Sequence, residues 1–426
     1  MFPPVDFSYR LNNQGRKIIF NKRFLSIALV LMAGCSSRLE INKKTVAAAF
    51  DETNLPYAVL GVSTWKNDPQ FYSYGDANPN AVFEIASMTK AITATAVIQL
   101  VEAGEIDLDV PVANYLPEIN EIKILEEDLT TRPGTVPITM RHLLTHTSGI
   151  VYSFNSMRIM KALGLAPGEW PLPEAVPEGI YDWGFNGPQP RRVFEAGDRW
   201  QYGRSLGVAG RVVERISGLD LDTYFKMHIF NPLGMTRSGY NIPDDVRVDL
   251  MPMSMRDPAT GELMPMPSMR PVPMESFYGG GDLLSTPRDY VRFLQCLVNG
   301  GELDGVRILS EASVESFFTN QLPDGMTLSH PLVEAFDRSV NAPQRSIFDD
   351  QDTHSLAWTI ETNPDERGYR PQGVGSWAGI FNTYYTIDRE RGVVVVSFFQ
   401  LLPFNDGEAY ELYRIFEDLV YKSVLQ

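Results

Sequence analysis

The sequence predicts an α/β fold in which a helical lobe is inserted into a sheet lobe. Extended apolar runs occur near both ends of the 426-residue chain, at 57–62 and 393–399, and helical patterns at 41–53 and 407–424 flank them. Residues 91–245 instead have mostly helical patterns broken by loops. Strands at the two ends must share one sheet or form two, so the helical segment enters between them.

The length of the chain allows one large domain with a substantial core. We expect residues 41–426 to form a single domain, with a sheet lobe at about 41–90 and 275–426 and a helical lobe at about 91–274. A hydrophobic content of 44% excludes wholesale disorder. A net charge of -16, with no Lys/Arg block beyond residue 44, excludes a nucleic-acid partner, because phosphate binding requires a basic face.

Two irregular stretches interrupt the predicted helical lobe. Residues 162–200 are rich in Pro and Trp, a composition that favours a lid or a pocket wall over a passive linker. Residues 251–274 are rich in Met and Pro, and Pro is expected to prevent a central strand there. The thioethers of Met251, Met253 and Met255 suit Cu(I), but we favour the alternative, an adaptable apolar rim beside the site.

Residues 1–35 have the pattern of an export signal. A basic start precedes an apolar run from Phe24 to Met32 that is too short to span a bilayer, and Ala-Gly then leads to Cys35. Small residues directly before a cysteine resemble the bacterial lipoprotein signal, although Met32 stands where Leu is usual. We expect a lipidated Cys35 and a periplasmic, membrane-anchored protein. Secretion without a lipid and a retained anchor are the alternatives.

Ser87 and Lys90 form an S-x-x-K pattern where an extended run, 81–85, meets a predicted helix at 91–103. Ser87 is therefore expected in the first helical turn, where free backbone N–H groups and the positive end of the helix dipole lie beside its hydroxyl. Lys90, three residues on, shares its face. A partly desolvated lysine with a lowered pKa can take the proton from a serine hydroxyl. A capped helix with a solvated lysine is the alternative for this pattern alone.

Further motifs occur in an order that strengthens the catalytic hypothesis. They are ITMRHLLTHTSG at 138–149, WQYGRS at 200–205, NPLGM at 231–235, GGGDLLST at 279–286 and GSWAG at 375–379. Together with Ser87 and Lys90 they resemble the serine β-lactamase and penicillin-binding superfamily, specifically its class C-like branch, and are closest in motif to the family VIII carboxylesterases. The resemblance covers about residues 45–420 and implies a β-lactamase-like fold with terminal helices packed on an antiparallel sheet.

The resemblance implies roles for the residues that match the family motifs. Ser87 matches the acylated nucleophile, Lys90 its partner, and Tyr202 the tyrosine of the Y-x-N element. Tyr202 can serve as base or acid if an adjacent ammonium favours its anion, so the Lys90 and Tyr202 protons would titrate as a coupled pair. The oxyanion hole would be formed by the backbone N–H groups of Ser87 and Ile380.

The sequence departs from the lactamase and peptidase motifs on the substrate side. Arg204 stands where they have Asn, and Trp377-Ala378 stand where they have Lys-Thr before Gly379. An amide, a cation and a hydroxyl are thereby lost, which points away from β-lactams. A Trp followed by small residues resembles the W-G-G element of the esterases. Arg204, Trp377, Ala378 and Gly379 are therefore the substrate-binding candidates, for a small-molecule ester or amide.

The remaining candidates receive structural interpretations. His142 and His146 lie in a T-H-T-S-G setting typical of a structural turn rather than of a catalytic triad. No His or Cys spacing suggests zinc, and Gly279–Gly281 lacks the lysine of a phosphate loop. Cys296 lies in an amphipathic helical pattern and is expected in the core. We expect no metal and no cofactor.

These patterns together predict an exported serine hydrolase that cleaves carboxylic esters through an acyl-Ser87 intermediate. A β-lactamase, a D-alanyl peptidase and an acyltransferase are alternatives with the same chemistry. From a different class, the alternative is a penicillin-binding-like sensor of envelope polymers. The intact set of Ser87, Lys90 and Tyr202 argues against a sensor.

Overall fold

The computed structural model describes residues 39, 41–65, 67–164, 192–257, 259–268, 270, 272–328, 348–363 and 370–425. The chain divides into two units, Met1–Arg38 and Leu39–Gln426. The predicted export signal with Cys35 lies outside the described residues, as does most of the irregular stretch 162–200. Within the described ranges, no helix combines the length and the apolar character needed to cross a bilayer.

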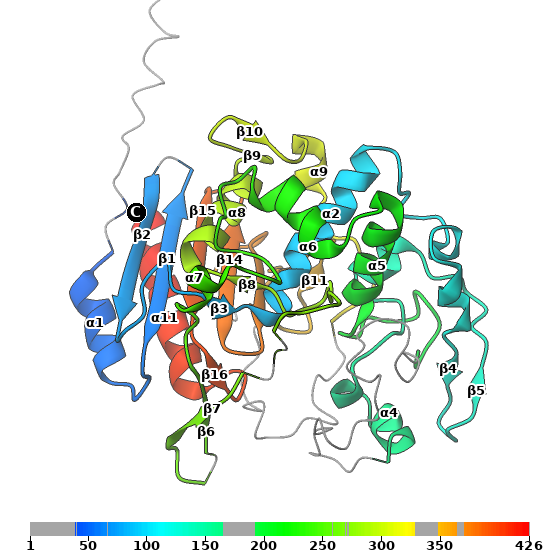
Figure 1. The fold of residues 1–426 in the computed structure, drawn as a ribbon, viewed down its shortest axis with the longest axis horizontal. Coiled ribbons are helices and arrows are strands. Elements are labelled where there is room, and N and C mark those ends of the chain that lie inside the picture. The colour runs from blue at the N-terminus through cyan, green and yellow to red at the C-terminus, as the bar shows by residue number, and fades with distance from the viewer. Residues whose placement is uncertain are drawn as a thin grey trace, which may run out of the picture. The chain divides into compact units, whose positions relative to one another are not determined.

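A seven-stranded antiparallel sheet joins the two ends of the chain, in the order β11-β12-β13-β14-β15-β1-β2 (Figure 1). Its strands are β1 (Ala58–Thr64), β2 (Asn67–Tyr74), β11 (Thr353–His354), β12 (Thr359–Ile360), β13 (Gly375–Gly379), β14 (Thr383–Asp388) and β15 (Val393–Phe398). β1 pairs with β15, with Val59 opposite Phe398. Strands from the two ends of the chain therefore share one sheet, the first of the two predicted arrangements.

Helices cover both faces of this sheet. Tyr384 on β14 stacks on Tyr413, with ring centroids 4.8 Å apart, whereas its neighbour Tyr385 packs on Tyr290 at 5.6 Å. Tyr413 belongs to α11 and Tyr290 to α8, which therefore lie on opposite faces, because successive side chains of a strand alternate. Figure 1 shows α1 beside α11, so the N- and C-terminal helices pack together. The helices concerned are α1 (Lys43–Asp51), α8 (Pro287–Val298) and α11 (Gly407–Val424).

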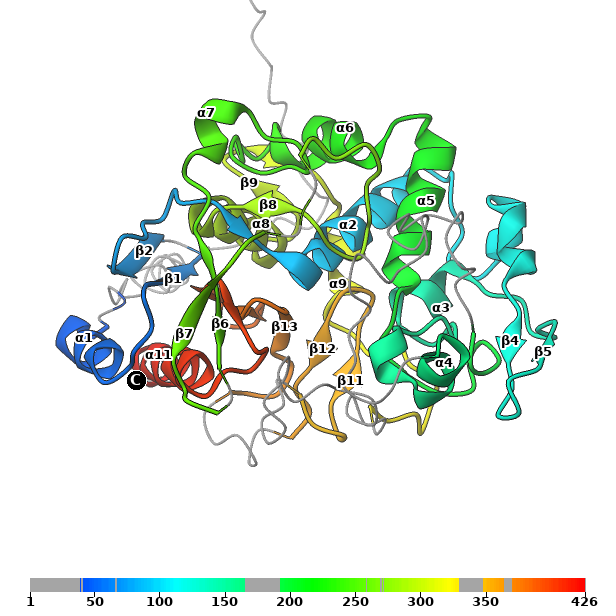
Figure 2. The same ribbon diagram turned by 60° about the horizontal axis from the view of Figure 1, so that its bottom comes forward.

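The helix α2 (Thr89–Glu102) is buried along most of its length. It directly follows a 3₁₀ helix, Ala86–Met88, and ends before Gly104, whose φ of 75° suits the left-handed conformation common after a helix. Helices α5 (Ser205–Ser217) and α6 (Leu221–Phe225) contact it, and Figure 2 shows α2 between β8 (Leu284–Ser285) and α5. A helix with so little exposed surface holds its side chains in fixed positions.

The other helices and short sheets are distributed along the rest of the chain. The helices are α3 (Met140–Leu144), α4 (Met157–Ala162), α5 (Ser205–Ser217), α6 (Leu221–Phe225), α7 (Asp244–Arg247) and α9 (Glu311–Glu315), with a π-helical turn at Lys226–Phe230 and 3₁₀ helices at Val112–Asn114, Pro117–Glu121 and Ser153–Asn155. The two-stranded sheets are β3 (Phe83–Glu84) with β8 (Leu284–Ser285), β4 (Ile124–Leu125) with β5 (Thr131–Arg132), and β9 (Glu302–Leu303) with β10 (Val306–Arg307). Apart from α9, these helices precede the methionine-rich segment.

The methionine-rich segment forms a β-hairpin, so the prediction that Pro prevents a central strand there was wrong. β6 (Met253–Arg256) lies between β16 (Leu401–Leu402) and β7 (Leu263–Met266) in a three-stranded sheet. Pro252 precedes β6, so every residue of the central strand keeps its N–H group. Pro265 lies in β7, an edge strand, where a missing N–H is tolerated.

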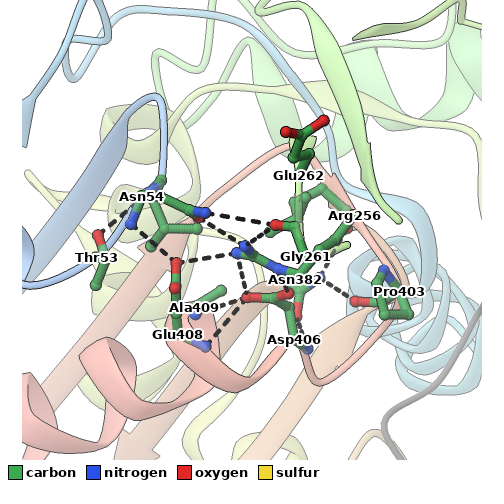
Figure 3. Close-up of polar contacts among 12 residues, drawn as sticks. Thr53, Asn54, Arg256, Gly261, Glu262, Asn382, Pro403, Asp406, Glu408 and Ala409 are labelled. Carbon is green, nitrogen blue, oxygen red and sulfur yellow. Dashed lines mark hydrogen bonds and ion pairs between the residues drawn. The ribbon is translucent and has the colours of Figure 1, made fainter. Parts of the chain in front are cut away.

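Arg256 ties this hairpin to the first turn of α11 (Figure 3). Its guanidinium donates to Asp406 at 2.5 and 3.1 Å, to Glu408 at 3.0 Å and to Asn54 at 2.6 Å. Asp406 also caps α11 by accepting from the backbone N–H groups of Glu408 and Ala409. The Asp406 side chain is only 1% exposed, so Arg256 balances a buried charge.

Candidate active site

Ser87 lies at the junction between β3 and α2. It occupies the middle of the 3₁₀ helix Ala86–Met88, and Ala86 has a left-handed φ of 43°. Tyr290 of α8 donates a hydrogen bond to the carbonyl of Met88 at 2.9 Å, which fixes this turn from behind. The prediction placed Ser87 in the first helical turn, and the structure places it in the 3₁₀ turn that leads directly into α2.

Lys90 points from the first turn of α2 toward Ser87. Its Nζ lies within hydrogen-bond distance of Ser87 Oγ, at 3.0 Å, and of the Tyr152 hydroxyl, at 3.2 Å, and it donates to the Gly280 carbonyl at 2.6 Å. Lys90 is 2% exposed. Burial lowers the pKa of Lys90 well below its usual value, and Asp282 acts against this decrease. A neutral amine in hydrogen-bond contact with a hydroxyl can accept its proton.

Tyr202 approaches Ser87 from the loop before α5. Its hydroxyl donates to Ser87 Oγ at 2.7 Å. Burial raises the pKa of Tyr202, and its hydrogen bond with Ser87 only partly offsets this increase. The Lys90 Nζ lies 4.9 Å from the centre of the Tyr202 ring. Burial therefore acts against the ammonium and phenolate pair that the coupled titration also allowed.

The strand β13 runs beside the 3₁₀ helix that holds Ser87. A Cβ atom on Gly379 would lie 2.4 Å from the carbonyl oxygen of Ile85, so only glycine lets the two backbones approach this closely. Ile380 follows Gly379 and begins the turn to β14. Trp377 is buried, and the centre of its ring lies 5.2 Å from the centre of the Tyr202 ring. Ala378 is also buried and contributes no polar side-chain group.

Two tyrosines beside Lys90 were missed by the sequence reasoning. The hydroxyls of Tyr152 and Tyr278 are 3.0 Å apart, and Tyr152 is the one that contacts Lys90. The guanidinium carbon of Arg204 lies 6.0 Å from the centre of the Tyr278 ring. Arg204 therefore lies near the Tyr278 side of this pair. Tyr152 follows the T-H-T-S-G motif and Tyr278 precedes the G-G-G motif, so proximity to recognised motifs was the available signal.

His146 has a structural environment. It is 2% exposed, has a left-handed φ of 58°, and its Nδ1 accepts from the Gly203 N–H at 3.4 Å. Burial lowers its pKa well below the usual value. His142 accepts from the Thr139 N–H at the start of α3. In the described part of the chain, the side chains that hydrogen-bond Ser87 Oγ are Lys90 and Tyr202, not these histidines.

Other reactive groups lie outside this arrangement. Cys296 is fully buried in α8, as expected, and burial raises its pKa to about 12. The carboxylates of Asp349, Asp352 and Glu361 have oxygens within 4.8 Å of one another and are the residues of the described ranges that could hold a cation. Asp349 and Asp352 precede β11 and Glu361 follows β12, and the side chains of the described ranges that hydrogen-bond Ser87 Oγ do not include them.

Comparison with known proteins identifies the family. The Beta-lactamase family model matches residues 44–419. This chain belongs to the β-lactamase family. The family resemblance and the α/β fold class expected from the motifs are therefore confirmed.

Relatives of this β-lactamase family member include both transferases and an esterase. Acyltransferase calJ of Penicillium decumbens is 31% identical over 345 residues, or 78% of this chain and 79% of that protein. Lovastatin esterase of Penicillium rubens is 29% identical over 371 residues, which cover 80% of this chain and 85% of that protein. The structure of a LovD6 mutant of simvastatin synthase from Aspergillus terreus has a TM-score of 0.77 and 25% identity, over 90% of this chain and 95% of that one. The chain is thus a member of a superfamily of serine acyltransferases and hydrolases.

Proposed function

We propose that this protein is a serine esterase that hydrolyses uncharged carboxylic esters through an acyl-Ser87 intermediate. The observation that carries the proposal is that Ser87 Oγ lies within hydrogen-bond distance of both Lys90 Nζ and the Tyr202 hydroxyl, at 3.0 and 2.7 Å. A nucleophile contacted by two groups that exchange protons is the geometry required for covalent acyl transfer.

Lys90 is the proposed base in the first step. Ser87 Oγ attacks the ester carbonyl while its proton moves to the neutral Lys90 amine across their 3.0 Å contact. Burial, which lowers the pKa of Lys90, supports this assignment because it makes the amine available near neutral pH. The carbonyl of Gly280, 2.6 Å away, then accepts a hydrogen bond from the ammonium that forms.

Tyr202 is the proposed acid for the leaving alcohol. Its raised pKa keeps the hydroxyl protonated, and the hydroxyl is 2.7 Å from the attacking oxygen. When the alcohol leaves, Tyr202 donates its proton to the alcohol oxygen and regains one from the Lys90 ammonium. Water then attacks the acyl-enzyme with the same two groups acting in reverse.

The backbone N–H groups of Ser87 and Ile380 are the proposed oxyanion hole. Supporting this assignment, Gly379 brings β13 to within van der Waals contact of the backbone at Ile85, two residues before Ser87. The sheet and the start of the helix hold these two N–H groups in place. They therefore do not have to reorient when negative charge develops on the substrate oxygen.

The residues on β13 support an uncharged substrate. Trp377 and Ala378 place an aromatic wall and a methyl group where a cation and a hydroxyl would bind a carboxylate. A β-lactam carboxylate would lose water there without gaining an ion pair on that strand. The guanidinium carbon of Arg204 lies 6.0 Å from the centre of the Tyr278 ring, and its contribution to substrate binding is tested by the Arg204→Ala variant.

Acyl transfer to an alcohol is the second candidate. The 31% identity with acyltransferase calJ, and the fold shared with simvastatin synthase, favour it. Transfer and hydrolysis share the acyl-Ser87 intermediate and differ in whether an alcohol or water takes the acyl group. Adding a secondary alcohol during p-nitrophenyl butyrate turnover tests which acceptor is used.

The N-terminus supports a proposal about location. We propose that the protein is an exported lipoprotein anchored in a membrane through Cys35, on the basis of the apolar run and the Ala-Gly-Cys sequence. A sensor of envelope polymers would share this location, but it would not require the hydrogen bonds between Ser87, Lys90 and Tyr202.

One preparation of the enzyme tests the proposed activity. We expect hydrolysis of p-nitrophenyl acetate and butyrate and little or no hydrolysis of nitrocefin. Ser87→Ala should lose ester hydrolysis and is the control for contaminating esterases. Wild-type protein that binds a fluorophosphonate at Ser87 yet turns over none of these substrates would contradict esterase activity.

A further inference from the structure

Two tyrosines form a hydrogen-bonded pair that the proposed mechanism does not use. The hydroxyls of Tyr152 and Tyr278 lie 3.0 Å apart, and the Tyr152 hydroxyl lies 3.2 Å from Lys90 Nζ. Both side chains are buried. Hydrogen-bond contacts therefore continue from Ser87 through Lys90 and Tyr152 to Tyr278.

Two glycines make room for the ring of Tyr278. A Cβ atom on Gly207 of α5 would overlap this ring, and a Cβ atom on Gly280 would also overlap it. Packing this close leaves the ring little room to move. The carbonyl of Gly280 accepts the hydrogen bond from Lys90 Nζ at 2.6 Å. The same short segment therefore holds a carbonyl against Lys90 and a hydroxyl against Tyr152.

The neutral Lys90 amine of the proposed mechanism has two N–H groups and one lone pair for its three neighbours. The neighbour Gly280 offers a carbonyl, which can only accept, so it takes one N–H. The lone pair must face Ser87 to take its proton. The second N–H must then go to Tyr152, which offers Lys90 its oxygen and donates its own hydrogen to another group.

A tyrosine that contacts only an amine has the opposite preference. The hydroxyl of a phenol is far more acidic than the N–H of a neutral amine, so the phenol donates and the amine accepts. Donation by Tyr152 would occupy the Lys90 lone pair, and Ser87 would lose the group that takes its proton. Within the described ranges, the hydrogen-bond partners of the Tyr152 hydroxyl are Lys90 and Tyr278. Tyr278 is therefore the group that can accept the Tyr152 hydrogen.

We propose that Tyr278 is a positioning residue that accepts the hydrogen of Tyr152 and thereby directs the lone pair of Lys90 toward Ser87. The proposal rests on the proposed function of Ser87 and Lys90. The hydrogen bonds then run in one direction, from Ser87 to Lys90 and from Lys90 to Tyr152. Tyr152 in turn donates to Tyr278, and bonds that run in one direction strengthen one another. Neither tyrosine exchanges a proton with the substrate, unlike Tyr202.

Phenylalanine variants test this role and keep the aromatic rings. Tyr278→Phe removes the acceptor of the Tyr152 hydrogen. Tyr152→Phe removes the hydroxyl that would otherwise occupy the Lys90 lone pair, and a double variant carries both changes. Tyr421→Phe is the matched control, because Tyr421 is also a buried tyrosine but its hydroxyl contacts Asp388. Circular dichroism checks that each variant is folded.

The measurement is the rate constant for labelling of Ser87 by a fluorophosphonate near neutral pH, followed by intact mass. Ser87 Oγ attacks phosphorus, fluoride leaves and the Ser87 proton moves to Lys90, so the rate depends on the direction of the lone pair. Tyr278→Phe should lower the rate constant about tenfold. The same substitution in the Tyr152→Phe background should change it by less than about twofold. Tyr421→Phe should match the wild type.

Two outcomes would overturn the role of Tyr278. One is a folded Tyr278→Phe variant that is labelled as fast as the wild type. The other is an equal loss with and without the Tyr152 hydroxyl, because a merely structural contribution of Tyr278 does not depend on that group. Labelling does not require ester turnover, so the expected rates without ester hydrolysis would contradict the proposed function alone. Ester hydrolysis with equal losses in both backgrounds would contradict the role of Tyr278 alone.

Discussion

The chemistry at Ser87 depends on how burial changes the two side chains that contact it. Lys90 and Tyr202 are both removed from solvent, and burial disfavours the charged form of each. The amine is thereby prepared to accept a proton and the phenol to donate one. The same burial thus gives opposite roles to the two residues, because one is charged when protonated and the other when deprotonated.

Removing either proton-transfer group should slow the reaction. We predict that Lys90→Ala and Tyr202→Phe each lower kcat for p-nitrophenyl esters by about a hundredfold or more. Wild-type kcat/KM should fall as the pH decreases through the lowered pKa of Lys90, because protonation removes the base. Lys422→Ala, at a mostly exposed lysine of α11, is the control and should be fully active. Full activity of Lys90→Ala at neutral pH would instead favour His146 as the base.

The Arg204→Ala variant tests whether the site tolerates a carboxylate. The guanidinium lies near Tyr278, so it is a candidate to replace the cation missing from β13. We predict that wild-type kcat/KM for nitrocefin is far below that for p-nitrophenyl butyrate. Any residual nitrocefin hydrolysis should fall in Arg204→Ala while ester hydrolysis is retained. Equal wild-type kcat/KM values for the two substrates would show that Trp377 and Ala378 do not decide specificity.

At the residue scale, the motifs identified Ser87, Lys90 and Tyr202 and the structure brings them into contact. Tyr152, Tyr278 and Gly280 could not be assigned in the same way. Their positions around Lys90 depend on loops that meet only in the folded chain. A tyrosine near a motif has no distinctive pattern of its own, so sequence can suggest it but not assign its contact.

At the scale of secondary structure, long elements were predictable and short ones were not. The helical patterns at 91–103 and 407–424 correspond to α2 and α11 within two residues at each end. The β6–β7 hairpin was missed because its prolines were counted against the whole segment, although they flank the central strand or lie on the edge strand. Whether a Pro interrupts strand pairing depends on which strand of the sheet it occupies, and the local sequence does not show this.

The contribution of the contact between Arg256 and Asp406 to the stability of the protein can be tested. We predict that Arg256→Met destabilises the protein by about 3–5 kcal/mol, because the buried Asp406 loses the charge that balances it. Lys422→Met, which breaks an exposed ion pair with Asp418, should cost no more than about 1 kcal/mol. Urea unfolding of both variants measures the difference. Equal destabilisation by the two substitutions would show that Asp406 finds another partner or remains hydrated.

At the scale of the whole molecule, the two ends of the chain complete one sheet around a site built from the segments between them. The pairing of β1 with β15 places N- and C-terminal strands side by side. The 3₁₀ helix after β3 carries Ser87, and α2 directly after it carries Lys90. Sequence patterns could not choose between one sheet and two, because pairing between distant strands leaves no local signal. The family motifs supplied that information through their order.

The N-terminal residues lead to a prediction about the mature protein. We expect the native protein to begin at a lipidated Cys35 and to partition with membranes, because the apolar run ends in Ala-Gly-Cys. Mass spectrometry of the native N-terminus measures this. Cys35→Ala should give soluble enzyme with unchanged turnover. An unmodified Cys35, or a retained segment before it, would refute the expectation.

The most direct test of the central claim is to trap the acyl-enzyme. Rapid mixing with p-nitrophenyl butyrate, acid quenching and peptide mass spectrometry should find one butyryl group on Ser87, with less accumulation in Lys90→Ala and none on that peptide in Ser87→Ala. The adduct should disappear at the rate of steady-state turnover or faster. Steady turnover without a butyryl group on Ser87, or with the group on another residue, would contradict the proposed mechanism.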